Sequence, residues 1–151
     1  MSETLFIGSD PGVSGTTAFL YGEERWEVRH TATETEVSEA IAEALDRADG
    51  RAFALLEEVH AMPKDSNSSA FTFGQSYGTL RGLFVAHRVP FEIVRPSKWQ
   101  AKMKCRTGGD KKISRARAQE LQLFSKIVHA NADAWLLCEL ARRVKTGEAV
   151  L

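Results

Sequence analysis

Three short apolar runs in the chain each stop at an acidic residue or a proline. They are residues 5–10 (LFIGSD), which end in Asp10, residues 51–59 (RAFALLEEV), and residues 91–95 (FEIVR), which stop at Pro96. Continuous apolar runs of this length between turn signals are typical of strands buried on both faces. The pattern therefore predicts three core strands.

The remaining segments alternate between strand-like and helix-like patterns. Residues 16–22 and 25–32 flank a short turn and are predicted to pair as antiparallel strands. Apolar positions at helical spacing predict four helices, over residues 37–48, 69–87, 110–124 and 129–145. This order of elements predicts an α/β fold in one domain spanning residues 1–151, with a five-stranded mixed sheet and helices on both faces.

The helix predicted over residues 69–87 carries Gly74, Gly78 and Gly82 at a spacing of four. Residues four apart share one helix face, so the three glycines form a stripe that another backbone can approach closely. Packing of this stripe against the sheet is the simplest explanation.

Composition excludes several classes of protein. With 43% hydrophobic and 26% charged residues, the chain is neither disordered nor collagen-like, and no apolar run is long enough to span a membrane. The first ten residues lack the basic and apolar regions of a signal peptide, so we expect a cytoplasmic protein, in the host cell if it is encoded by a phage. Cys105 and Cys138 are isolated from each other and are expected to be reduced thiols.

The net charge is zero, but the charges are segregated along the chain. Residues 23–49 hold nine acids and three bases, whereas residues 95–126 hold ten bases and two acids. A basic field of this kind attracts a polyanion, although a charge run is also a common solvated surface. We expect these basic side chains to bind DNA phosphates: Lys98, Lys102, Lys104, Arg106, Lys111, Lys112 and Arg115.

Acidic residues occur where an apolar core is expected. Asp10 ends the first core strand, Glu57 and Glu58 end the second, and Asp133 interrupts an Ala/Leu-rich helix on which His129 is expected to share its face. Ligands gather at the carboxyl ends of parallel strands, and carboxylate oxygens suit Mg²⁺ or Mn²⁺.

Each of these residues also has a structural interpretation. Asp10 could be a turn residue before Pro-Gly, and His129 could cap its helix. One of Glu57 and Glu58 must point away from the other, because successive side chains of a strand face opposite sides. The combination of acids is more informative than any single member.

Several motifs resemble RuvC-type Holliday junction resolvases. They are Asp10-Pro11-Gly12-Val13-Ser14-Gly15, residues 54–62 (ALLEEVHAM) and Gly74-Gln75-Ser76-Tyr77-Gly78. Residues 96–100 (PSKWQ), 110–124 and 129–143 are similar to the phage-encoded branch of that family. The resemblance covers nearly the whole chain.

The resemblance implies an RNase H-like fold, a homodimer, two Mg²⁺ or Mn²⁺ ions in each active site, and paired nicks in a four-way DNA junction. It places the family acids on Asp10, Glu57 and Asp133, all metal ligands and catalytic residues. His129 stands where a fourth acid is usual, as a metal ligand or an acid–base group. Phe71 or Phe73 is expected to stack on opened bases.

Two other classes of protein remain as alternatives. A catalytically silent DNA-binding relative would gain nothing from carboxylates clustered beside phosphate. A sugar-kinase or actin-like phosphotransferase shares an Asp-x-Gly loop but needs two duplicated domains, and 151 residues without a repeat do not supply them. We therefore expect a nuclease that uses no nucleotide cofactor and no membrane.

Overall fold

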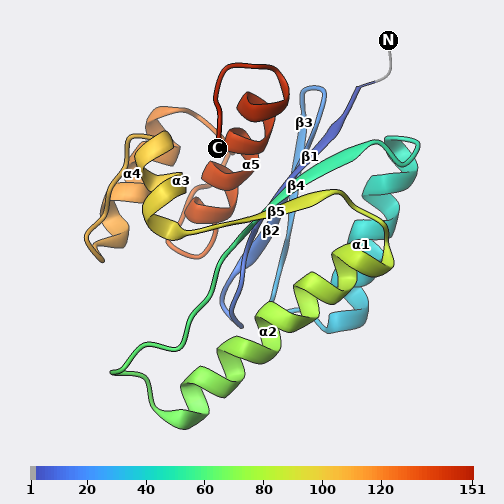
Figure 1. The fold of residues 1–151 in the computed structure, drawn as a ribbon. Helices are drawn as coiled ribbons and strands as arrows, with labels where there is room; N and C mark the ends of the chain where they lie inside the picture. Colours follow the sequence, from blue (N-terminus) through green and yellow to red (C-terminus); the bar gives the residue numbers. More distant parts are fainter. Residues whose placement is uncertain (1–2) are drawn as a thin grey trace.

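The computed structural model describes residues 3–151 and contains a five-stranded sheet between two layers of helices (Figure 1). The strands are β1 (Leu5–Asp10), β2 (Thr16–Tyr21), β3 (Glu24–Arg29), β4 (Ala52–Glu57) and β5 (Phe91–Val94). The helices are α1 (Glu34–Arg47), α2 (Asn67–Ala86), α3 (Pro96–Lys102), α4 (Lys111–Glu120) and α5 (Ala132–Lys145).

The sheet is mixed, with strand order β3-β2-β1-β4-β5. β1, β2 and β3 form an antiparallel meander, while β4 runs parallel to β1 and β5 runs parallel to β4. In the β1–β4 register Ser9 lies opposite Leu56, so the next residues, Asp10 and Glu57, emerge side by side at the carboxyl ends of the two strands. The predicted mixed α/β sheet is confirmed.

Helices cover both faces of the sheet, as predicted. In Figure 1, α1 and α2 lie on one face and α3, α4 and α5 on the other. The period-two alternation of β4 separates the two cores: Phe53 and Leu55 pack with α3–α5, whereas Ala54 and Leu56 pack with α1 and α2. Within residues 3–151, no helix is both long and apolar enough to cross a bilayer.

Helix α5 lies directly on the central strand β1. Residues 132–141 of α5 are all buried, so this helix has almost no solvent-facing side over its first three turns. A Cβ atom on Gly8 of β1 would lie 2.1 Å from the carbonyl oxygen of Ala134 and 2.2 Å from the backbone nitrogen of Cys138. Glycine at position 8 therefore permits the contact that sets α5 against the sheet.

Three boundaries differ from the prediction. Pro96 ends β5 but also opens α3 at its first turn, where the missing N–H of proline is no loss. Helix α4 ends at Glu120, and α5 begins at Ala132, not at His129. His129 therefore lies in the turn before α5, and the predicted shared helix face with Asp133 is wrong.

The glycine stripe of α2 does not pack against the sheet, contrary to the simplest explanation. A Cβ atom on Gly74, Gly78 or Gly82 would meet nothing within 4 Å outside the helix's own backbone. The stripe therefore faces outward in the monomer.

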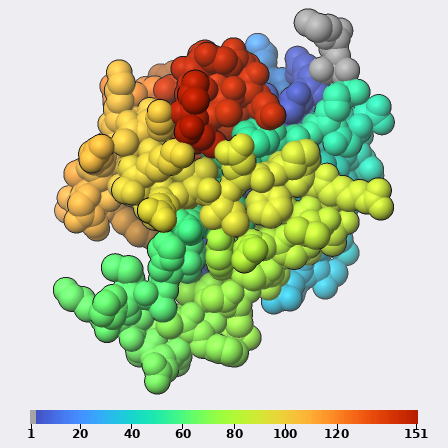
Figure 2. Space-filling view, in the orientation of Figure 1, coloured from blue at the N-terminus to red at the C-terminus, as the bar shows by residue number. Residues whose placement is uncertain are grey.

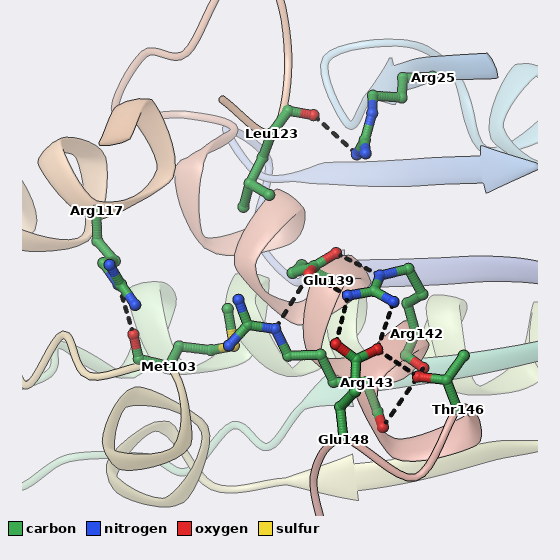
Figure 3. A network of polar contacts seen from close by, with 9 residues as sticks. All are labelled: Arg25, Met103, Arg117, Leu123, Glu139, Arg142, Arg143, Thr146 and Glu148. Carbon is green, nitrogen blue, oxygen red and sulfur yellow. Dashed lines mark hydrogen bonds and ion pairs between the residues drawn. The ribbon is translucent and has the colours of Figure 1, made fainter. Parts of the chain in front are cut away.

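Polar tethers fix the helical layer on the α5 side of the sheet (Figure 3). Arg117 of α4 donates to the carbonyl of Met103 at 2.9 Å, and Arg25 of β3 donates to the carbonyl of Leu123 at 3.2 Å. At the end of α5, the largely buried Glu139 binds two arginines, and one of these also reaches Glu148. These contacts hold the segments before and after α4 in place.

Candidate active site

Three carboxylates from distant parts of the chain meet at one point. Asp10 ends β1, Glu57 ends β4 and Asp133 lies in the first turn of α5. Each offers an oxygen, and these three oxygens all lie within 4.8 Å of one another. Asp10 and Asp133 are buried and Glu57 is half-buried, so the group is a partly enclosed cluster of negative charge.

The cluster is electrostatically unfavourable in the absence of a cation. Burial, and then the charges of Glu57 and Asp133, raise the pKa of Asp10 well above its ordinary value. Burial and the charge of Asp133 raise the pKa of Glu57 to about 7, and burial also raises that of Asp133. A divalent cation would remove this penalty, and an all-oxygen donor set fits Mg²⁺ or Mn²⁺.

Neighbouring side chains bind the outer atoms of these carboxylates. The indole Nε1–H of Trp99, in α3, donates to Oε2 of Glu57 at 2.7 Å. The buried Ser114 of α4 lies beside Asp133 and offsets part of the rise in its pKa that burial causes. Trp99 is fully buried, and the short helix that carries it was not predicted from the sequence.

Lys111, the first residue of α4, projects toward the same carboxylates. Its positive charge lowers the pKa of Asp10, Glu57 and Asp133, and it lines the cleft around them. From the sequence, Lys111 was predicted only to bind DNA phosphates.

The loop after Asp10 is held on both sides. The backbone N–H of Gly12 donates to Ser76 Oγ of α2 at 2.8 Å, and Nδ1–H of His30 donates to the carbonyl of Gly12 at 3.2 Å. With Nδ1 protonated, Nε2 of His30 accepts from the Thr17 hydroxyl at 2.8 Å. Gly12 has φ of +117°, a backbone conformation that other residues rarely adopt. The loop that follows the first acid is thus fixed by contacts to α2 and to the end of β3.

His129 stands at the rim of the site, in a turn with its own supports. It is exposed and lines the same cleft as the acids, but it is not among the three residues whose ligand atoms cluster. The turn is held by Thr16, which donates to the carbonyl of Ala130 at 2.7 Å, and by Asn131, whose Nδ2 donates to Glu27 at 3.0 Å. Because Oδ1 of Asn131 accepts from the backbone N–H of Val128 at 2.8 Å, the Asn131 side chain makes no capping bond to α5.

Of the two adjacent glutamates, Glu57 lies in the acid cluster and Glu58 does not. Glu58 turns away from the cluster and accepts from Nε of Arg95 at 3.2 Å, with His60 also near at 3.4 Å. Glu57 alone of the pair lies with Asp10 and Asp133.

A cleft of about 870 Å³ opens over the carboxylates. Its walls come from the loop after β1, the start of α2, the α3–α4 segment and the turn before α5. Phe73 lines the cleft and packs over Gly12, whereas Phe71 does not line it and is 69% exposed. Residues 58–70 (green) project from the body of the molecule in Figure 2.

The predicted basic surface is solvent-exposed and continues from the cleft along α3 and α4. Apart from the half-buried Arg115, the predicted phosphate-binding residues are exposed: Lys98, Lys102, Lys104, Arg106, Lys111 and Lys112.

The architecture matches that of two solved structures. No protein-family model and no curated protein sequence matches the chain. Among solved structures, RuvC of Thermus thermophilus in complex with a Holliday junction substrate matches with a TM-score of 0.62 and 14% identity, over 95% of this chain and 96% of that one. A second Thermus thermophilus RuvC structure matches with a TM-score of 0.62 and 15% identity, over 95% and 97%. The fold is that of RuvC.

At these identities the similarity shows the fold, not the activity. The cluster of Asp10, Glu57 and Asp133 is compatible with binding of divalent metal ions.

Proposed function

We propose that this protein is a metal-dependent endonuclease that resolves four-way DNA junctions and related branched DNA by paired nicks. The observation that carries the proposal is the triad of Asp10, Glu57 and Asp133, held together at the floor of an open cleft. The match in fold to a RuvC structure in complex with a Holliday junction substrate supports branched DNA as the substrate.

Each residue of the cleft has a separate proposed role in phosphodiester hydrolysis. Asp10, at the end of the central strand, Glu57 and Asp133 would together hold the two Mg²⁺ or Mn²⁺ ions. Such ions supply activation of water and stabilisation of the leaving oxygen. The Lys111 ammonium adds positive charge beside the scissile phosphate, and the imidazole of His129 is placed at the rim either to ligate or to exchange a proton.

The surrounding surface would position the DNA. Phosphate contacts from lysine and arginine supply affinity with little sequence information, which suits a structure-selective enzyme. Phe73 at the cleft wall is better placed than Phe71 to stack on an opened base at the scissile position. We assign the chain to the phage-encoded branch on its motifs at residues 96–100 and 129–143, and to the cytoplasm, where such DNA is processed.

The deciding experiment is incubation with a labelled four-way junction, a fork and a linear duplex, in Mg²⁺, Mn²⁺ or EDTA. We expect cleavage of the junction with either ion and none in EDTA. Asp10→Asn, Glu57→Gln and Asp133→Asn should each abolish cleavage while junction binding in EDTA is retained, because affinity comes from the basic surface.

Glu58→Gln is the matched control, because Glu58 is adjacent to Glu57 but faces Arg95. It should cut at close to the wild-type rate. Junction binding without cleavage by the wild-type protein, in either metal, would instead identify a silent DNA-binding relative.

We further propose a homodimer, because a four-way junction presents two symmetry-related strands to cut and a two-fold assembly brings one active site to each. The outward glycine stripe of α2 is the proposed contact. Gly78→Leu adds a side chain where the monomer has open space, so it should leave the fold intact and shift the molecular mass measured by light scattering from dimer to monomer. A wild-type monomer that stays monomeric on junction DNA would refute the dimer.

A further inference from the structure

One oxygen of Glu57 is already bound by the protein. The Nε1–H of Trp99 donates to Oε2 at 2.7 Å, and the same carboxyl group lies with those of Asp10 and Asp133. An indole has a single N–H and no acceptor, so Trp99 donates to the carboxylate and cannot itself bind a metal ion. The hydrogen bond therefore restricts the rotation of the Glu57 side chain.

The position of Trp99 makes this contact rigid. The indole has no solvent exposure and belongs to a core cluster with residues of α4 and α5. Its helix, α3, begins with Pro96 directly after β5, the strand that pairs with β4. Trp99 is thus anchored beside the strand that carries Glu57, and its ring is not free to follow the carboxylate.

We propose that Trp99 is a positioning residue for Glu57. By occupying Oε2 it turns the remaining oxygen toward Asp10 and Asp133 and presents Glu57 to a metal ion through that oxygen alone. The inference rests on the proposed function, because it assumes that the triad binds metal. It adds to the site a buried tryptophan from a segment that was predicted only as a basic surface.

Trp135 provides an internal comparison. It is also fully buried, and its Nε1–H also donates to a carboxylate, Oε2 of Glu27 at 2.9 Å. Glu27 is not part of the clustered triad. Replacing either tryptophan with phenylalanine removes one buried indole–carboxylate hydrogen bond. Only the bond from Trp99 involves a carboxylate of the acid cluster.

The test measures Mn²⁺ binding by calorimetry at pH 8 for wild type, Trp99→Phe and the control Trp135→Phe. Loss of an outer partner of a metal ligand typically weakens affinity 10- to 100-fold, so Trp99→Phe should bind Mn²⁺ weaker by at least about tenfold. Trp135→Phe should stay within about threefold of wild type. In the Glu57→Gln background, Trp99→Phe should cause no further loss, because the two residues act through one ligand.

Three results would overturn the inference. They are unchanged Mn²⁺ affinity in Trp99→Phe, equal weakening in both tryptophan variants, and additive losses in the double variant. Absence of Mn²⁺ binding by the wild-type protein would refute the proposed function as well. This outcome is distinguishable from failure of the Trp99 inference alone, because it is seen without any variant.

A measurement on the wild-type protein avoids any folding defect of the variants. The chain has three tryptophans, so its ¹⁵N-indole spectrum contains three assignable Nε1–H signals. The Trp99 signal should shift on addition of Mg²⁺, while those of Trp26 and Trp135 stay in place. A Trp99 signal that does not respond to saturating Mg²⁺ would show that its contact with Glu57 is independent of the metal site.

Discussion

Replacing Glu57 with glutamine should stabilise the metal-free protein even though it destroys a proposed metal ligand. The carboxyl group of Glu57 lies within a cluster of three acids and is largely removed from water. Glutamine has nearly the same shape, and its amide oxygen can still accept from Trp99 while its amide nitrogen can donate to Asp10. The substitution therefore removes a buried charge and keeps the hydrogen bonds.

The magnitude follows from the pKa of Glu57, which rises from an ordinary value of 4.5 to about 7 in the folded protein. Between these values the folded state binds a proton that the unfolded state does not, so stability falls as the pH rises through this window and is lowest above pH 7. A rise of the pKa from 4.5 to about 7 corresponds to about 3 kcal/mol. For a chain of this size that is a rise in Tm of roughly 6–12 °C.

The assay is urea unfolding in EDTA at pH 8 and at pH 5. Glu57→Gln should exceed wild type by up to about 3 kcal/mol at pH 8, and by much less at pH 5, where the wild-type carboxyl is already protonated. Glu58→Gln, which lies outside the cluster and loses an ion pair with Arg95, should not be stabilised at either pH. Mg²⁺ should stabilise wild type but not Glu57→Gln.

A Glu57→Gln variant that is less stable than wild type in EDTA at pH 8 would refute the reasoning. The same conclusion would follow from a gain that is equal at both pH values, because it could not then arise from ionisation of the carboxyl group.

Two further predictions concern packing and DNA binding. Gly8→Ala should lower the free energy of unfolding measured in urea by about 3 kcal/mol, because the new Cβ meets the α5 backbone. Replacing Lys104 and Lys112 together by alanine should reduce the slope of log K against log salt for junction binding by about two, since each phosphate contact contributes roughly 0.9. As a control, Lys145→Ala, at the opposite end of α5 from Asp133, should leave that slope unchanged. If the slope of the Lys104/Lys112 double variant equals that of wild type, DNA follows another path.

The acidic site was predictable because its signals are local. Asp10 and Glu57 each close an apolar run, and the parallel pairing of β1 with β4 then brings them together. Asp133 was recognisable as a buried acid among alanines and leucines. Adjacency alone could not decide between Glu57 and Glu58; the resemblance to a family favoured Glu57, and the ion pair of Glu58 with Arg95 now explains the choice physically.

The features that were missed depend on contacts between distant residues. The start of α5 was placed too early because Asn131 binds Glu27, 104 residues away, and this bond holds the preceding residues in a turn. Pro96 was interpreted only as the end of a strand. Helix α3, and with it the hydrogen bond from Trp99 to Glu57, was therefore not predicted. Lys111 was read as a surface charge because its proximity to the acids arises only when α4 packs beside α5.

The absence of a side chain at Gly8 also governs how the molecule opens. Because the α5 backbone rests on β1 without an intervening layer, these two elements cannot separate by small steps, and their amide hydrogens should exchange only when the whole chain unfolds. The start of α2 and residues 60–66 are exposed and should exchange through local fluctuations of low free energy. Asp10 and Asp133 belong to the slowest-exchanging unit, whereas the start of α2 forms a wall of the cleft that they face, so this wall can move while the distance between the two acids stays fixed.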